Sequence, residues 1–232
     1  MLYTLALNRT VYWSWSLLFV LLFAASCSKG YNKHADDYYE QGMLFYEQME
    51  YSRSIESFTR VLELAPAGTE NNRVYFMRGR GHLKSRQFDE AVYDFTKAME
   101  LTAEGDSETR FLILEMRGDA FLGKNDLEKA IQDYSQALTT TPDHKNAKFL
   151  YLNRGWAFYH RNNFDSAISD FSRAIYTDSS LAEAYFARGN AWLKKKDSPR
   201  ALEDAKEALK LRPDVQKYDD FVYEVRSAIK SN

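Results

Sequence analysis

Small, aromatic and apolar residues return at fixed distances along most of the chain. Five stretches align on one glycine each, and a small residue lies twelve positions after every one of these glycines. In four of the five stretches an aromatic residue follows four positions later. The glycines are Gly42, Gly79, Gly118, Gly155 and Gly189. Such a long-range pattern predicts one structural unit that is repeated five times.

Each unit is predicted to be a pair of packed helices. Small residues such as Gly79 and Ala91 let the two helices approach closely, and apolar residues such as Phe88 and Val92 fill the space between them. Candidate caps at the start of the second helices are Asp89, Asp126 and Asp165. Prolines in a single column end three of these helices, at Pro66, Pro142 and Pro213.

The residue pattern resembles the tetratricopeptide repeat, which has a glycine and an aromatic residue in its first helix, Ala-x3-Phe in its second and a closing proline. The resemblance covers residues 35–213. Successive glycines are 37, 39, 37 and 34 residues apart, against a family period of 34, so three linkers carry extra residues. The resemblance implies an all-α, right-handed superhelical solenoid of five helical hairpins. Residues 214–232 carry an apolar stripe opposite a charged one, and we expect a C-terminal capping helix there.

The N-terminal segment is typical of an export signal. Residues 10–28 carry no charge, residues 17–25 are wholly apolar, and Arg9 precedes them. A short apolar core after a basic residue, ending in small residues, predicts a signal peptide over residues 1–26. An uncleaved signal anchor is the alternative, because 19 uncharged residues nearly span a bilayer.

Cys27 is the only cysteine of the chain, and it directly follows the small residues at 24–26. This arrangement resembles a bacterial lipobox, which implies that Cys27 carries the lipid and becomes the first residue of the mature protein. Residues 27–34 are then a short tether to the membrane of the bacterial cell envelope. By the same resemblance, Ser28 after the cysteine favours the outer membrane over the inner one.

Arginine and aspartate vary together between the repeats. Repeats two to five have an arginine directly before the glycine and an aspartate directly before the aromatic column, which holds Ala205 in repeat five. Repeat one has Gln41 and Ser57 at these two positions. The joint presence and absence of opposite charges predicts a structural ladder of ion pairs, within or between hairpins. Four arginines that grip an anionic ligand are the alternative. The residues are Arg78 and Asp94, Arg117 and Asp133, Arg154 and Asp170, and Arg188 and Asp204.

The resemblance also implies a concave face lined by the first helices. Positions spaced by four share one face of a helix, and here their residue types differ between repeats. Aromatic side chains mixed with opposite charges suit an extended peptide or a helix. Trp156 is the expected anchor because tryptophan is frequent at binding hot spots; packing against the neighbouring repeat is its other reading. The candidate groove residues are Tyr39, Met43, Phe76, Arg80, Glu115, Asp119, Leu152, Trp156, Tyr159, His160, Phe186 and Asn190.

Charge and candidate chemistry exclude several classes of function. With 31 Lys and Arg against 33 Asp and Glu, the formal charge is −2, which leaves no basic field for nucleic acid. One cysteine excludes an internal disulfide and a cysteine-based zinc site. The histidines lack metal-ligand spacing, and the sequence has neither a phosphate loop nor a nucleophile elbow. We therefore predict no catalytic residue, no metal and no cofactor.

The function that these patterns predict is a non-catalytic adaptor, which holds a protein partner at the cell envelope. A subunit of an outer-membrane assembly machine is one alternative. A periplasmic module that stacks a small ligand or glycan on the aromatic rings is another. An envelope hydrolase would need a clustered pair of carboxyl groups with perturbed pKa values in the groove. The partner's identity and the oligomeric state stay open.

Overall fold

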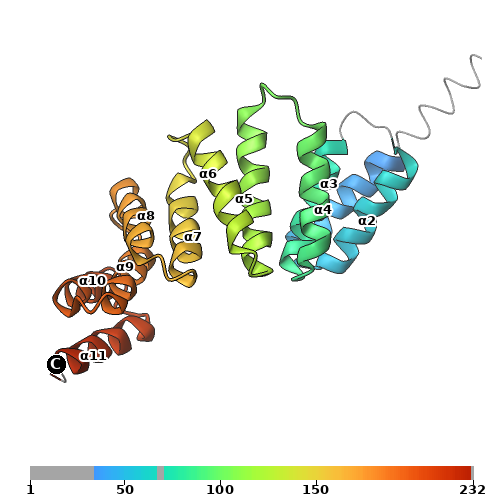
Figure 1. The fold of residues 1–232 in the computed structure, drawn as a ribbon. Helices are drawn as coiled ribbons and strands as arrows, with labels where there is room; N and C mark the ends of the chain where they lie inside the picture. Colours follow the sequence, from blue (N-terminus) through green and yellow to red (C-terminus); the bar gives the residue numbers. More distant parts are fainter. Residues whose placement is uncertain (1–33, 67–70, 231–232) are drawn as a thin grey trace, which may run out of the picture.

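The computed structural model describes residues 34–66 and 71–230, and every regular element in these ranges is a helix (Figure 1). The predicted signal peptide over residues 1–26, Cys27 and the tether up to residue 33 lie outside the described residues. The helices are residues 34–47, α2 (Tyr51–Leu64), α3 (Asn71–Lys84), α4 (Phe88–Leu101), α5 (Ser107–Gly123), α6 (Leu127–Thr140), α7 (Ala147–His160), α8 (Phe164–Thr177), α9 (Ala182–Lys194), α10 (Ser198–Leu211) and α11 (Gln216–Lys230).

These helices form five hairpins and one closing helix. Residues 34–47 pair with α2, where Phe58 packs against Gly42 and Tyr39. In the same way α3 pairs with α4, α5 with α6, α7 with α8 and α9 with α10, while α11 packs on α10. The hairpins stand side by side in one continuous arc (Figure 1). The predicted all-α solenoid of five hairpins with a C-terminal capping helix is thereby confirmed.

The turn inside every hairpin has the same conformation. Its residue seven positions after the repeat glycine is left-handed, with φ between 59° and 62°, although none of the five is glycine. The N–H of the next residue returns to a carbonyl five positions earlier, as from Gln87 to His82 at 2.9 Å. This 6→1 bond closes the first helix in a Schellman motif and sets the direction of the second helix. The left-handed residues are Met49, Arg86, Asn125, Asn162 and Lys196.

The capping prediction is right at one position and wrong at two. The carboxylate of Asp126 accepts a hydrogen bond from the N–H three positions on, at the start of α6. Asn163 caps α8 and Asp197 caps α10 through the same type of bond. Asp89 and Asp165 lie inside the first turns of α4 and α8 instead. There their negative charge still stabilises the helix, because it lies near the positive end of the helix dipole.

Close contact between each repeat glycine and a buried ring holds the hairpins together. A Cβ at Gly155 would lie 2.5 Å from the fully buried ring of Phe171. Repeat five has Ala205 in the aromatic column, and Phe221 of α11 fills that space instead, 2.9 Å from a Cβ built at Gly189. The C-terminal helix therefore completes the last hairpin as well as covering it.

Candidate functional site

The first helices of the hairpins lie on the inner side of the arc. α3 contacts α5, α5 contacts α7, and α7 contacts α9, although a whole second helix separates each pair in the chain. No comparable contact joins α4 to α6 or α6 to α8 within the ranges that the structure covers. Elements on the inside of a curve are closer together, so the first helices line the concave face.

Most of the predicted groove residues are half-buried positions on these first helices. One of them, Leu152, is only 8% exposed and belongs to a core cluster with Phe171 and Ala187. Glu115 is also buried, at 6% exposed, and His160 is exposed. The half-buried residues are Tyr39, Met43, Phe76, Arg80, Asp119, Trp156, Tyr159, Phe186 and Asn190.

Trp156 lies in an aromatic cluster of its own hairpin. Its ring meets Phe171 edge-on, with centroids 5.4 Å apart, and meets Tyr159 at the same distance. The exposed His160 ring stacks on it at 6.0 Å. Trp156 thus packs on the hairpin core with one part and stays half-exposed with the other, which is the position of an anchor held in one orientation.

The C-terminal helix closes one end of the groove. Phe186 packs against Phe221 and Tyr218 of α11, at centroid distances of 5.0 and 5.5 Å. Burial, and after it the charge of Glu224 on α11, raise the pKa of Tyr159 above its ordinary value. Phe186 is therefore covered by the chain's own last helix, and the open part of the groove runs over the first four repeats.

Two carboxyl groups with perturbed pKa values lie together on α5. Glu115 accepts a hydrogen bond from the side-chain amide of Asn146 at 3.0 Å. Asp119 accepts one from the Tyr134 hydroxyl at 2.6 Å and one from the Asn153 amide at 2.9 Å. Burial raises the pKa of both carboxyl groups, and the charge of Asp119 further raises the pKa of Glu115. Because these pKa values lie above those of the unfolded chain, ionisation of the pair costs folding free energy near neutral pH, and this cost falls as the pH is lowered.

The loop between α6 and α7 is built to hold Asn146 against Glu115. The ring of His144 in this loop stacks on Phe111 at 3.8 Å, and its Nε2 lies 3.1 Å from a carboxylate oxygen of Glu108. The backbone N–H of Asn146 donates to the other ring nitrogen at 3.1 Å. This linker is one of the three with extra residues. The sequence assigned no role to His144 or Asn146, because neither belongs to a repeating column.

Arg80 is a cation of the concave face that no carboxylate pairs with in the described residues. Its guanidinium lies over the rings of Tyr46 and Phe76, at 4.7 and 5.9 Å from their centroids. Its one hydrogen bond runs to the Met77 sulfur at 3.4 Å. Stacking on aromatic rings holds the guanidinium in place and leaves most of its donors to solvent or a ligand.

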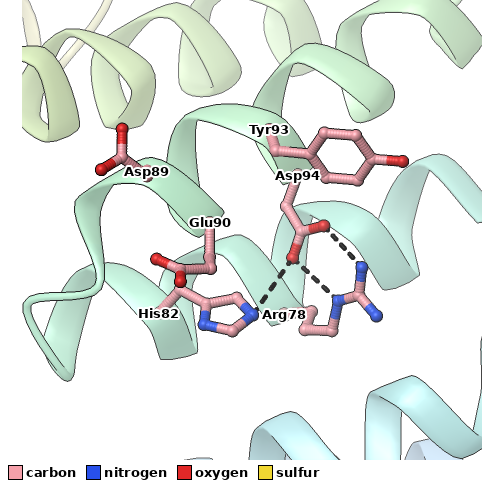
Figure 2. A pocket seen from close by; sticks show the side chains of 6 residues that line it. All are labelled: Arg78, His82, Asp89, Glu90, Tyr93 and Asp94. Atoms are coloured by element: carbon pink, nitrogen blue, oxygen red, sulfur yellow. Dashed lines mark hydrogen bonds and ion pairs between the residues drawn. The ribbon is translucent and has the colours of Figure 1, made fainter.

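The four arginines before the glycines each pair with the aspartate of their own hairpin. In repeat three, Arg117 donates from Nε and Nη2 to the two carboxylate oxygens of Asp133, at 2.7 and 2.8 Å. The other three pairs have the same bidentate geometry, with distances of 2.7 to 2.9 Å. Figure 2 shows the pair of repeat two, where His82 Nε2 also lies 3.7 Å from the Asp94 carboxylate. These guanidinium groups are largely buried and their hydrogen bonds are made within the protein. They therefore have a structural role and do not form a site for an anion.

A hydroxyl column continues this ladder from one hairpin to the next. The third guanidinium nitrogen, Nη1, donates to a Thr or Ser on the second helix of the preceding hairpin, at 2.9 to 3.4 Å. The acceptors are Thr59, Thr96, Ser135 and Ser172. The sequence reasoning missed them, although the signal is present: each directly follows the aromatic column, and Lys206 stands there in repeat five, which no arginine follows.

Comparison with known proteins agrees with this geometry. The sequence profile of the tetratricopeptide repeat family matches residues 115–180 and 152–215. The match spans residues 115–215, and the repeats and fold of the chain are similar to those of tetratricopeptide repeat proteins. No protein with a curated function matches the sequence.

Solved structures share the fold at low sequence identity. A tetratricopeptide repeat protein from Parabacteroides merdae has a TM-score of 0.73 at 16% identity, over 85% of this chain and 74% of that one. YrrB, described as having an unusual peptide-binding site, has a TM-score of 0.66 at 18% identity, over 88% of this chain and 97% of that one. The first repeat domain of Spaghetti (RPAP3), bound to an HSP90 peptide, has a TM-score of 0.50 at 24% identity, over 54% of this chain and 96% of that one.

Two further properties concern the described residues. None of their helices is both long and apolar enough to cross a membrane. They also contain no group of three or more His, Cys, Asp or Glu side chains arranged to hold a metal ion.

The ladder generates a graded stability prediction. Asp133→Ala leaves Arg117 without its partner, and breaking such a largely buried pair costs ~3–5 kcal/mol. At roughly 2–4 °C per kcal/mol, the melting temperature falls clearly. Ser135→Ala removes only the bond to Arg154 of the next hairpin, which costs about 0.5–1.5 kcal/mol. Thermal unfolding followed by circular dichroism measures both.

The control for this series is Asp143→Ala, in an exposed loop position without an ion pair in the described chain, which should leave the melting temperature unchanged. An Asp133→Ala variant as stable as the control would contradict the structural role of the ladder.

Proposed function

We propose that the protein is a non-catalytic scaffold that binds a peptide segment of a partner protein in its concave groove, at the bacterial cell envelope. The observation that carries the proposal is the composition of the concave face. Aromatic rings lie half-buried there beside charged groups that have no ion-pair partner in the described residues. Protein interfaces rely on such aromatic anchors with a few directed polar groups.

The fold supports a peptide as the ligand. YrrB is described as having a peptide-binding site, and the Spaghetti (RPAP3) domain is bound to an HSP90 peptide. A solenoid offers an extended concave surface of the kind that binds long, narrow ligands. Trp156 with Tyr159 and His160 is the expected anchor of the open part of the groove.

The envelope location rests on the sequence before residue 34. A signal peptide that ends at residue 26 makes Cys27 the lipidated first residue of the mature chain. Seven residues, 27–33, then separate the lipid from the first helix. They reach at most ~25 Å, so the first hairpin begins close to the membrane surface.

Crosslinking in the native host tests the groove. The protein, Trp156→Ala and Tyr223→Ala are crosslinked in cells, and the attached partner is identified by mass spectrometry. Tyr223 is the matched control because it is 76% exposed on α11. We expect Trp156→Ala to lose the partner and Tyr223→Ala to keep it, since truncation of a tryptophan hot spot commonly costs about 2 kcal/mol or more. Equal crosslinking of all three proteins contradicts binding at Trp156.

Intact mass and membrane fractionation test the anchor. The expected native form begins at Cys27, carries the added mass of a diacylglyceryl group and sediments with membranes, while Cys27→Ser is released from this attachment. A chain that begins at Met1 and stays membrane-bound without Cys27 would instead establish a signal anchor.

One observation favours a second candidate function, an envelope hydrolase. Glu115 and Asp119 are the clustered carboxyl pair with raised pKa values that such an enzyme needs. Incubation of the protein with peptidoglycan fragments tests it: turnover that is lost in Glu115→Gln and kept in Asp143→Asn supports hydrolysis. Absence of turnover with the native protein rejects this candidate for that substrate.

A further inference from the structure

The buried carboxylates of the described chain fall into two groups. Asp94, Asp133, Asp170 and Asp204 are the ladder acids, and each holds an arginine. Glu115 is the fifth buried carboxylate, and no cation pairs with it. Asp119, one helical turn away, has hydrogen bonds from Tyr134 and Asn153 and no ion pair. Two acids without an ion pair in the described residues therefore lie one helical turn apart on α5.

Each of the two acids keeps one oxygen without a donor. Asn146 bonds to Oε2 of Glu115, and both donors of Asp119 bond to its Oδ1, which leaves Oε1 and Oδ2. Neither of these two oxygens accepts a hydrogen bond or ion pair from the described residues, so each is available as an acceptor.

The neighbourhood supplies donors that fix the acids without neutralising them. Tyr134, Asn146 and Asn153 are uncharged and hold the two carboxylates in place. Lys84, exposed at the end of α3, acts on Asp119 through its charge and forms no ion pair with it. Residues four apart on a helix have Cβ atoms ~5–6 Å apart, so one cationic group can reach both free oxygens. An acceptor pair of fixed geometry is preorganised for such a group.

Charges and rings follow a fixed order along the open groove. Arg80 lies on α3, Glu115 and Asp119 on α5, and Trp156 on α7, and these helices contact one another in that order. Neighbouring packed helices are ~8–10 Å apart. An extended peptide rises ~3.3 Å per residue, so about three of its residues pass from one first helix to the next.

We propose that Glu115 and Asp119 form a subsite for a lysine or arginine side chain of an extended partner peptide. Trp156 takes an apolar side chain about three residues to one side of it, and Arg80 takes an acidic one about three residues to the other. The recognised segment thus has the pattern acidic-x2-basic-x2-apolar, in either chain direction. This inference rests on the proposed function and adds the chemistry of the partner to it.

Selection from a displayed library of random dodecapeptides tests the subsite. The intact protein in detergent is compared with Glu115→Gln/Asp119→Asn and with Asp219→Asn/Asp220→Asn, a matched pair of exposed acids on α11. We expect the native protein and the α11 variant to enrich peptides with a basic residue at the central position, and the groove variant to lose that enrichment. The groove variant keeps the acceptors for Asn146, Tyr134 and Asn153, and its melting temperature at pH 7 verifies that it folds.

The best selected peptide is then synthesised with its basic residue and with glutamine in its place. Binding to the native protein is expected to weaken about 10- to 100-fold on this change, as for a charge-assisted hydrogen bond, and to change little for the groove variant. Selected peptides without a basic residue, or equal enrichment by the groove variant, overturn the subsite and leave the proposed function standing. Failure of the native protein to enrich any peptide counts against the proposed function, and the subsite is rejected with it.

Discussion

The bidentate pair between an arginine of the first helix and an aspartate of the second is the interaction on which the rest of the solenoid depends. Each hairpin of repeats two to five has one, and the remaining guanidinium nitrogen reaches a hydroxyl of the preceding hairpin. One side chain therefore fixes the geometry inside a hairpin and its attachment to the neighbour. In a repeat protein only neighbouring units touch, so the curvature of the whole groove is the accumulated result of these local joints.

The features that recur in every repeat are visible in the sequence. The hairpins follow from the glycine and aromatic columns, and the ladder residues follow from the joint change of Arg and Asp between repeats. The hydroxyl column is equally periodic, because Thr59, Thr96 and their counterparts stop where no arginine follows. Periodic features are predictable because one physical requirement is repeated several times in the same chain.

The candidate site depends on contacts that occur only once. Nothing periodic indicates that Asn146 reaches Glu115, that Asn153 reaches Asp119, or that Phe221 takes the place of a missing ring beside Gly189. Leu152 also shows that a column position alone does not predict exposure. It shares a column with groove residues, yet it packs in a core cluster with Phe171 and Ala187. Position in a repeat gives the face of a helix, and the packing of each joint decides how much of that face is open.

The contrast between the ladder acids and the α5 acids connects stability with function. A buried carboxylate is tolerated when a cation and several hydrogen bonds compensate it, which the ladder achieves. Glu115 and Asp119 receive hydrogen bonds but no ion pair, and burial raises their pKa values, as it does for the ladder acids Asp170 and Asp204. The extra residues between α6 and α7 carry His144 and Asn146, and both favour the ionised form of Glu115, although burial outweighs them. The fold gives four buried acids an arginine each and leaves Glu115 and Asp119 without an ion pair in the described residues, so a ligand cation is the group that would supply one.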